Sequence, residues 1–381
     1  DLDRIQYDAI HLRTGYDQWG LAGSILDRIT FGGPGVFSRP NLEASFYLQD
    51  SWNVKPGLLI EPGIRQDWDE LLRNFAFSPR ISASWLPFGW KNTKLMGGYA
   101  ITRDATSLQE WSRPLDQYSI TTNFNPDGTP AGGPLYTYFN IPNRHLRTPG
   151  YSNWTLALER RFPRNVSLSA NYLRKRGEDG LTYLASPGVA DPSVNALFQL
   201  SNYRKDVYDS VGLTVRQSFG KQYEWMASYT RSRALSNAVL DLSVDQPLWV
   251  TNNLGRMPWD APNHFLAWAY LPTPWQNWAI AALVEQRTGF PFSEVTDSGI
   301  TVGEINSLRY PNYFDLDFHV ERKLRLGKRY VALRGGFSNL TNHRNPTVVN
   351  NVIGSPQFLN YYGSLGRHVV FRLRWLGKAD R

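Results

Sequence analysis

The sequence predicts an all-β fold in which antiparallel strands form a barrel that spans a membrane. Three observations carry this prediction: apolar and polar residues alternate, short and long connections alternate along the chain, and aromatic residues are abundant. The chain has 381 residues, of which 14% are aromatic and 19% are charged. Soluble domains usually contain about 25% charged residues, so the charge content is low. The aromatic content excludes a disordered chain.

The alternation has a period of two residues. In the last predicted strand, Phe371, Leu373 and Trp375 alternate with Arg372 and Arg374, and the same pattern recurs in the ranges 42–54, 166–172, 211–219 and 313–324. Strict alternation is typical of strands with one apolar and one polar face. We expect about 14 strands, each near the 9–11 residues that a tilted membrane strand needs. They begin near Ile10, Leu42, Leu58, Pro79, Lys94, Trp154, Val166, Asp209, Tyr223, Phe265, Trp278, Tyr313, Arg329 and Arg367.

The connections indicate which kind of barrel this is. Six short turns alternate with longer segments that are rich in Gly, Pro and aromatic residues. Barrels of the bacterial outer membrane have short periplasmic turns and long extracellular loops. We therefore expect an outer-membrane barrel in contact with lipid and lipopolysaccharide, with long extracellular loops and periplasmic termini. The short turns lie around Lys55, Gly89, Pro163, Gly220, Pro274 and Gly327.

A spanning helix is not expected. The longest stretch without charged residues covers 261–284, but Pro272 and Pro274 lie in its middle. Proline removes helical hydrogen bonds, so two strands joined by a turn explain this stretch better.

Motifs for catalysis, metals and nucleotides are lacking. The sequence has no Cys, which excludes disulfides, Cys-based zinc sites and thiol catalysis. The six His residues form no close pair and no HExxH motif, and there is no GxSxG elbow or phosphate-binding Gly-rich loop. We predict no enzyme, no metal and no cofactor.

The net charge is +8. Basic clusters around 160–176 and 322–329 fall near predicted turns and strand ends, where we expect lipid headgroups rather than nucleic acid. Other arginines are predicted to line the lumen, either to favour anionic solutes or to form ion pairs with lumen acids. These are Arg216, Arg334 and Arg372, with Arg231 and Arg374 as further candidates.

Six motifs occur in one order through nearly the whole chain. The longest are YLQDSWNVKPGLLIEPGIRQDW at 47–68, YDSVGLTVRQSFGKQYEWMASYTRSRALSNA at 208–238 and YFDLDFHVERKLRLGKRYVALRGGFSNLTNHRNP at 313–346. Together with the ranges 78–89, 259–272 and 286–293, they resemble the C-terminal barrel portion of TonB-dependent outer-membrane receptors. The resemblance is to the Oar-like group, which has a carboxypeptidase-regulatory-like N-terminal domain.

Receptors of this family combine a TonB box, a plug and a barrel of about 22 strands. We expect residues 1–381 to form a single barrel domain without the plug and the first strands. Either these strands close alone, or an upstream segment or a second chain completes the barrel.

The resemblance implies a receptor that binds a siderophore, an oligosaccharide or a peptide at extracellular loops and imports it with the TonB complex acting through the plug. The alternative is a plugless barrel that acts as a passive pore or as a structural partner in an outer-membrane assembly. Aromatic residues of the predicted loop 103–153 are the best candidates for substrate contact, with packing of this loop against itself as the alternative. They are Trp111, Tyr118, Phe124, Tyr136 and Tyr138.

Overall fold

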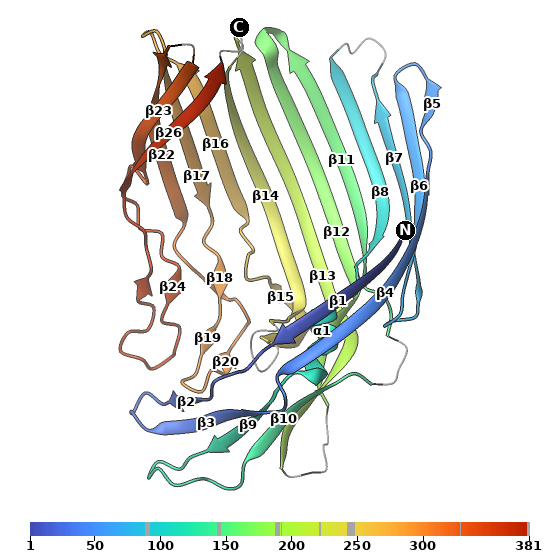
Figure 1. Cartoon of the computed structure of the whole chain (residues 1–381), viewed down its shortest axis with the longest axis vertical. Coiled ribbons are helices and arrows are strands. Elements are labelled where there is room, and N and C mark those ends of the chain that lie inside the picture. Colours follow the sequence, from blue (N-terminus) through green and yellow to red (C-terminus); the bar gives the residue numbers. More distant parts are fainter. Residues whose placement is uncertain are drawn as a thin grey trace.

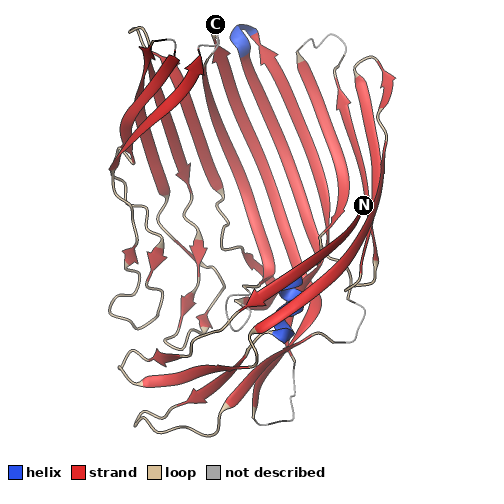
Figure 2. Ribbon diagram, in the orientation of Figure 1, coloured by secondary structure: helices blue, strands red, loops and turns tan. Residues whose placement is uncertain are grey.

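The computed structural model describes residues 1–87, 92–142, 146–186, 191, 193–220, 222–241, 248–327 and 329–378. One sheet of 20 strands dominates it (Figures 1 and 2). Six of these strands are short extensions or belong to the long connections, and the other fourteen form one antiparallel wall. In order across the wall they are β1 (Leu2–Ile10), β4 (Val36–Gln49), β6 (Leu58–Asp69), β7 (Phe75–Trp85), β8 (Thr93–Arg103), β11 (Gly150–Phe162), β12 (Val166–Ala185), β13 (Val194–Phe219), β14 (Tyr223–Val239), β16 (Asn263–Pro272), β17 (Trp278–Arg287), β22 (Tyr313–Leu326), β23 (Arg329–Ser338) and β26 (His368–Lys378).

The predicted all-β class and the predicted strand count are therefore confirmed. The predicted starts near Ile10 and Asp209 are wrong, because β1 ends at Ile10 and β13 begins at Val194. Seven of the fourteen wall strands are longer than the expected 9–11 residues. β4, β6, β11 and β22 have 12–14 residues, whereas β14 has 17, β12 has 20 and β13 has 26. β12 and β13 continue beyond the length that a membrane needs, so residues 175–185 and 194–208 form a long hairpin.

The remaining elements are short. β5 (Trp52–Lys55) and β15 (Trp249–Arg256) extend the wall, whereas β2 (Tyr16–Trp19), β3 (Ile25–Gly32), β9 (Tyr118–Asn123) and β10 (Leu135–Asn140) lie in long connections. Small ribbons pair β18 (Pro291–Phe292) with β21 (Leu308–Arg309), β19 (Glu294–Val295) with β20 (Thr301–Val302), and β24 (Val348–Val349) with β25 (Tyr361–Tyr362). The helices are α1 (Leu108–Ser112) and two 3-10 turns, η1 (Arg113–Leu115) and η2 (Pro163–Asn165). In the described part of the chain, no helix is long and apolar enough to cross a membrane.

Short and long connections lie at opposite ends of the wall, as predicted (Figure 1). All six predicted short turns join neighbouring wall strands, although residues 88–91, 221 and 328 within them lie outside the described residues. The turn between β5 and β6 requires glycine, because Gly57 has a φ of +83° and an added Cβ would lie 3.0 Å from the Leu86 carbonyl oxygen.

The wall has an apolar outer face and a polar inner face. On β13, Val211 and Leu213 are 56% and 47% exposed. Thr214 lies on the opposite side and shares a hydrogen bond with Ser228 of β14, at 3.0 Å. The same alternation places Phe371 of β26, which is 77% exposed, on the outer face. Side chains of this kind are stable on a surface that faces lipid.

The wall is open between its first and last strands. In the described residues, β1 pairs only with β4, β26 pairs only with β23, and no ladder joins β1 to β26. The two edge strands therefore each present one row of unpaired backbone groups.

An arginine on the outer face should destabilise the barrel, whereas one on the inner face should not. We expect Leu213→Arg to lower the free energy of unfolding by about 2 kcal/mol, because the guanidinium would enter hydrocarbon. Ser169→Arg is the matched control, since Ser169 lies on the inner face of β12 opposite Glu159, and we expect a loss below about 1 kcal/mol. Urea unfolding of the chain in lipid bilayers measures both values, and equal losses would contradict the assignment of the faces.

Candidate functional site

The predicted aromatic loop 103–153 folds into a small sheet at the end of the wall where the long connections lie. β9 pairs with β3 and β10, and β10 adds in parallel to the extended part of β13. We call β2, β3, β9 and β10 the loop sheet. Because successive side chains point to opposite faces of a strand, the loop sheet has two different surfaces.

One surface carries tyrosines. Tyr136 and Tyr138 are two residues apart on β10, and Tyr118 is at the start of β9. The ring centroid of Tyr118 lies 5.0 Å from that of Tyr138 and 6.1 Å from that of Tyr136. The rings of Tyr136 and Tyr138 are stacked at 6.0 Å. We call these three half-buried residues the tyrosine face. The structure thus brings three of the five predicted contact residues together.

The tyrosine face depends on a glycine. The Tyr118 ring lies over Gly32 of β3, where an added Cβ would be only 2.5 Å from the ring. A side chain at this position would therefore displace Tyr118 from the cluster.

The opposite surface of the loop sheet packs into a buried core. Phe139 stacks on Phe198 of β13 at 5.2 Å and meets Tyr183 of β12 edge-on at 5.0 Å. Trp111 of α1 belongs to the same cluster and is 9% exposed. Trp111 was predicted to contact substrate. Its burial agrees instead with the alternative, in which the loop packs against itself.

The fifth predicted residue, Phe124, lies apart from the tyrosine face. It follows β9 and forms an isolated bridge with Pro130. The Arg28 guanidinium lies 5.7 Å from the centroid of its ring.

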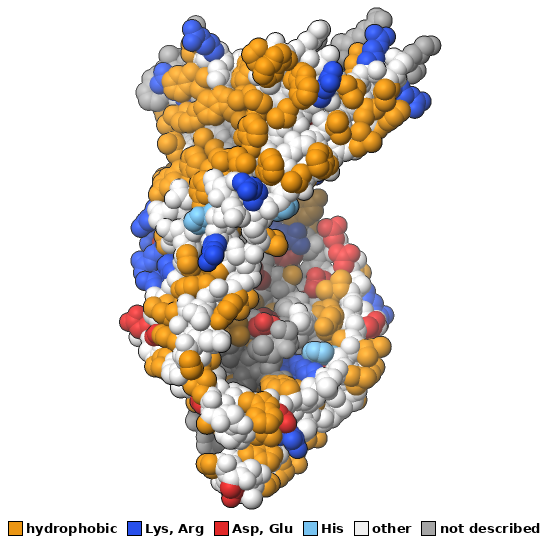
Figure 3. Space-filling view, turned by 90° about the vertical axis from the view of Figure 1, so that its left-hand side faces the viewer, with side chains coloured by type: hydrophobic (Ala, Val, Ile, Leu, Met, Phe, Trp, Pro, Cys, Tyr) orange, Lys and Arg blue, Asp and Glu red, His pale blue; other side chains and the backbone are white. Residues whose placement is uncertain are grey.

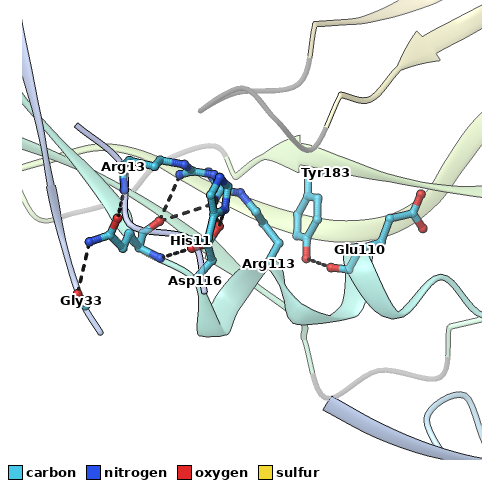
Figure 4. Close-up of polar contacts among 8 residues, drawn as sticks. His11, Arg13, Gly33, Glu110, Arg113, Asp116 and Tyr183 are labelled. Atoms are coloured by element: carbon cyan, nitrogen blue, oxygen red, sulfur yellow. Dashed lines mark hydrogen bonds and ion pairs between the residues drawn. The ribbon is translucent and has the colours of Figure 1, made fainter. Parts of the chain in front are cut away.

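A buried carboxylate joins the residues before β9 to the segment that follows β1 (Figure 4). The Oδ2 atom of Asp116 accepts hydrogen bonds from Arg13 at 3.1 Å and from Arg113 at 2.9 Å, and His11 Nδ1 lies 2.9 Å away. The side chains of Asp116, Arg13 and Arg113 are 5%, 8% and 3% exposed. Gln117 extends the network, because its side chain accepts from the Arg13 backbone N–H and donates to the Gly33 carbonyl.

A second anchor joins α1 to β12. The Tyr183 hydroxyl donates to the carbonyl oxygen of Glu110 at 2.8 Å. Burial raises the pKa of the Glu110 carboxyl to about 7, although the positive charge of Arg204 opposes this shift. Near neutral pH a much larger fraction of this carboxyl is therefore protonated than of an exposed glutamate.

The inner face of the wall encloses a cavity next to residues 103–106, which precede α1. This cavity of about 540 Å³ lies against β4, β6, β7 and β8, and charges of both signs line it. Arg65 forms an ion pair with Asp67 at 2.8 Å, and Asp69 accepts from the Thr106 hydroxyl at 2.9 Å. Figure 3 shows a hollow in the lower half of the molecule with acidic, basic and His side chains around it, and apolar side chains gathered toward the end with the short turns.

The three arginines predicted to line the lumen all lie on the inner face. Arg216 of β13 forms an ion pair with Glu224 of β14. Arg334 and Arg372 lie opposite each other on β23 and β26. The strands β14, β16, β17 and β22 separate Arg216 from this pair.

The arginine pair is close to a buried acid. Glu321 is 2% exposed and lies opposite Arg334 in the ladder. It accepts from the Tyr270 hydroxyl at 2.9 Å and pairs with Arg374 at 3.1 Å. The carboxylate is thus satisfied by these two partners. In the described residues, Arg334 and Arg372 form no ion pair.

The assignment of Arg231 to the lumen is wrong. Arg231 is two residues from Tyr229, which is 43% exposed, and lies opposite Val211 on the outer face. The alternation of apolar and polar residues along β14 would have placed Arg231 on the same face as Tyr229. Arg174 and Arg176, expected near a turn, lie in the middle of β12 because that strand continues to Ala185.

Metal ligands do not gather in the described part of the chain, where no group of three or more His, Asp or Glu residues is arranged to hold an ion. His145 lies outside the described residues.

The Asp116 network was not predicted from the sequence, since Arg13 and Asp116 are 103 residues apart. No local pattern signals such a pair. The two residues meet only in the folded chain, where the loop sheet brings their segments together.

Loss of the Asp116 carboxylate should destabilise the loop sheet. We expect Asp116→Asn to lower the local opening free energy of β9 and β10 by about 3 kcal/mol, because two buried guanidinium groups would lose the negative charge of Asp116. Hydrogen exchange of the amides in β9 and β10 measures this change. Asp17→Asn is the control, because its ion pair with Arg28 is exposed and should contribute less than about 1 kcal/mol. Equal protection in both variants would contradict the anchoring role.

Solved structures with a similar fold come from outer-membrane proteins. The outer membrane transporter YddB from Escherichia coli matches with a TM-score of 0.67 and 13% identity, over 98% of this chain and 50% of YddB. A mutant of the ferric enterobactin receptor PfeA from Pseudomonas aeruginosa has a TM-score of 0.61 and 17% identity, over 88% of this chain and 45% of PfeA. The siderophore receptor PirA from the same species has a TM-score of 0.54 and 15% identity, over 88% and 48%.

The chain spans about half the length of these structures, and at such low identity the likeness shows the fold alone. No curated protein sequence matches the chain. A family profile described as "Outer membrane beta barrel domain" matches residues 71–301, which is more than half of the chain. This match agrees with the apolar outer face, the polar inner face and the antiparallel wall. The chain therefore belongs to the outer membrane β-barrel domain family.

Proposed function

We propose that this chain is the barrel part of a TonB-dependent outer-membrane receptor that binds a substrate at its long connections and passes it inward for import. The observation that carries the proposal is the tyrosine face. Three aromatic side chains with polar tips share one accessible surface of a sheet that is firmly anchored to the barrel. Such surfaces recognise ligands through stacking and hydroxyl hydrogen bonds.

The inner cavity supports the same function. Its lining mixes carboxylates and guanidinium groups with Ser and Thr, which suits a polar solute in transit better than an apolar one. The solved structures with this fold include a transporter and siderophore receptors by their own names. We retain a siderophore, an oligosaccharide and a peptide as substrate classes for this chain.

The proposal includes an arrangement for the rest of the receptor. Residues 1–381 form one barrel domain, corresponding to the C-terminal part of an Oar-like receptor, with the long connections extracellular. A plug with a TonB box and further strands, from the same chain or a second one, complete the barrel. The free edges of β1 and β26 support this arrangement, since backbone groups in lipid must be paired. No catalytic step is assigned.

A second candidate is a plugless barrel that acts as a passive pore or as a structural partner in an outer-membrane assembly. The inner-face arginines Arg334 and Arg372 favour the pore, because neither forms an ion pair in the described residues. Such charges select anions in water-filled barrels.

Removal of the tyrosine face should weaken substrate binding. We expect the triple variant Tyr118→Ala, Tyr136→Ala and Tyr138→Ala to raise the Kd of the bound substrate class by about tenfold or more, because each ring contributes about 0.5–1.5 kcal/mol of stacking. Titration of the detergent-solubilised chain with a ferric siderophore, an oligosaccharide and a peptide measures binding by tryptophan fluorescence.

Two controls sharpen this experiment. The triple Tyr→Phe variant keeps the rings and separates stacking from hydroxyl contacts. Tyr229→Ala removes a tyrosine from the outer face and should leave the Kd unchanged. An unaltered Kd in the triple alanine variant would remove the tyrosine face from the proposal. Uptake by cells that persists without TonB would favour the passive pore.

The lumen arginines should set ion preference if the barrel conducts. We expect Arg334→Gln with Arg372→Gln to lower the ratio of chloride to potassium permeability in planar bilayers by about twofold or more. The control is Arg216→Gln with Glu224→Gln, which removes an ion pair and leaves the net charge unchanged. An unchanged ratio in the first variant would show that these arginines do not act on permeating ions.

A further inference from the structure

Four arginines gather on the outer face of β12 and β14, which flank β13. We call Arg174 and Arg176 of β12 and Arg231 and Arg233 of β14 the outer arginine patch. Asp209 of β13 lies between them, opposite Arg174 on one side and Arg233 on the other. Arg174, Arg231 and Arg233 are exposed, and Arg176 is half-buried.

The alternation of each strand places the patch on the side that faces lipid. Arg174 is two residues from Tyr172, Arg231 is two residues from Tyr229, and Asp209 is two residues from the exposed Val211. Residues two apart on a strand share a face. The patch therefore continues the apolar outer surface toward the long connections.

The patch lies at the border of the apolar band. On β13 the outer side chains run from Phe219 near the short turn to Val211, which is about 26 Å along the strand and about 20 Å after correction for strand tilt. The apolar band of an outer-membrane barrel is about 25 Å tall. Asp209 and its arginine neighbours thus reach the level of the lipid headgroups.

The patch has an excess of positive charge. Asp209 pairs with Arg176 at 2.8 Å and with Arg174 at 3.6 Å, so one carboxylate serves two guanidinium groups. Arg231 donates to the neutral side-chain oxygen of Asn263 at 2.7 Å. In the described residues, Arg233 has no ion pair.

A groove of about 1020 Å³ adjoins the patch. Arg231, Arg233 and Val211 line it on the side of the wall, and β15 and the segment 301–309 form its other side. Arg256 there donates to the carbonyl oxygens of Asn306 and Ser307. Two acids, Asp260 and Glu304, lie on that side of the groove. They do not neutralise the positive charge of the patch, because Asp260 already forms an ion pair with Arg309 and only Glu304 adds a further negative charge.

We propose that this groove and the outer arginine patch bind the phosphate groups of a phosphorylated glycolipid in the outer leaflet, the lipid A part of lipopolysaccharide. The apolar surface of Tyr172, Val211 and Leu213 receives its acyl chains. A guanidinium group can donate two parallel hydrogen bonds to two oxygens of one phosphate. Arginines without an acidic partner at a lipid boundary are stabilised by anionic headgroups. The proposal rests on the extracellular orientation of the long connections stated above, but not on substrate import.

The test measures lipid retention by the full chain in nanodiscs of zwitterionic lipid. The added probes are lipid A with both phosphates, dephosphorylated lipid A and phosphatidylglycerol, and native mass spectrometry counts the bound copies. We expect bisphosphorylated lipid A to be retained most strongly. Arg174→Gln with Arg231→Gln and Arg233→Gln should reduce its retention by about tenfold or more.

The matched control removes three positive charges from the opposite end of the same wall, at Arg160, Arg161 and Arg164, by substitution with Gln. It should retain lipid A as the unaltered chain does. Equal unfolding midpoints establish that both variants are folded. Equal retention by the patch variant, or retention of phosphatidylglycerol in preference to lipid A, would overturn the proposal. Neither outcome affects substrate binding at the tyrosine face, which is measured separately.

Discussion

Pairing of the backbone within lipid is the constraint on which this structure depends. A strand in hydrocarbon has no water to satisfy its N–H and C=O groups, so every wall strand must lie between two neighbours. Twelve of the fourteen wall strands meet this condition within the chain, and β1 and β26 meet it on one side only. The apolar outer face follows from the same constraint, because the side chains that alternate outward contact lipid.

Beyond the hydrocarbon the stabilising forces change. There the chain builds a water-excluding core from Trp111, Tyr183 and Phe198 and a buried ion network around Asp116. Such a network is costly to desolvate and is stable only when every partner is present. It connects the segment after β1 with α1, so the start of the wall and the middle of the chain form one unit at this end.

Much of the wall was predictable because alternation is a local property of the sequence. The strand count, the short turns and the inner position of Arg216, Arg334 and Arg372 all follow from period and spacing. The loop sheet was not predictable, since the pairing of β10 with β13 and of Arg13 with Asp116 joins distant segments. Arg231 was misplaced although Tyr229 is two residues away, because its residue type outweighed its position in the alternation. The grouping of three tyrosines needed the register of β9 against β10.

The length of β12 and β13 has a consequence for recognition. About half of each strand rises beyond the membrane as a continuous hairpin, and β10 is hydrogen-bonded directly to it. The tyrosine face is consequently part of a continuous sheet with β12 and β13 and does not lie on an unpaired loop. A ligand that docks there has little loop entropy to overcome, so more of its contact energy is expressed as affinity.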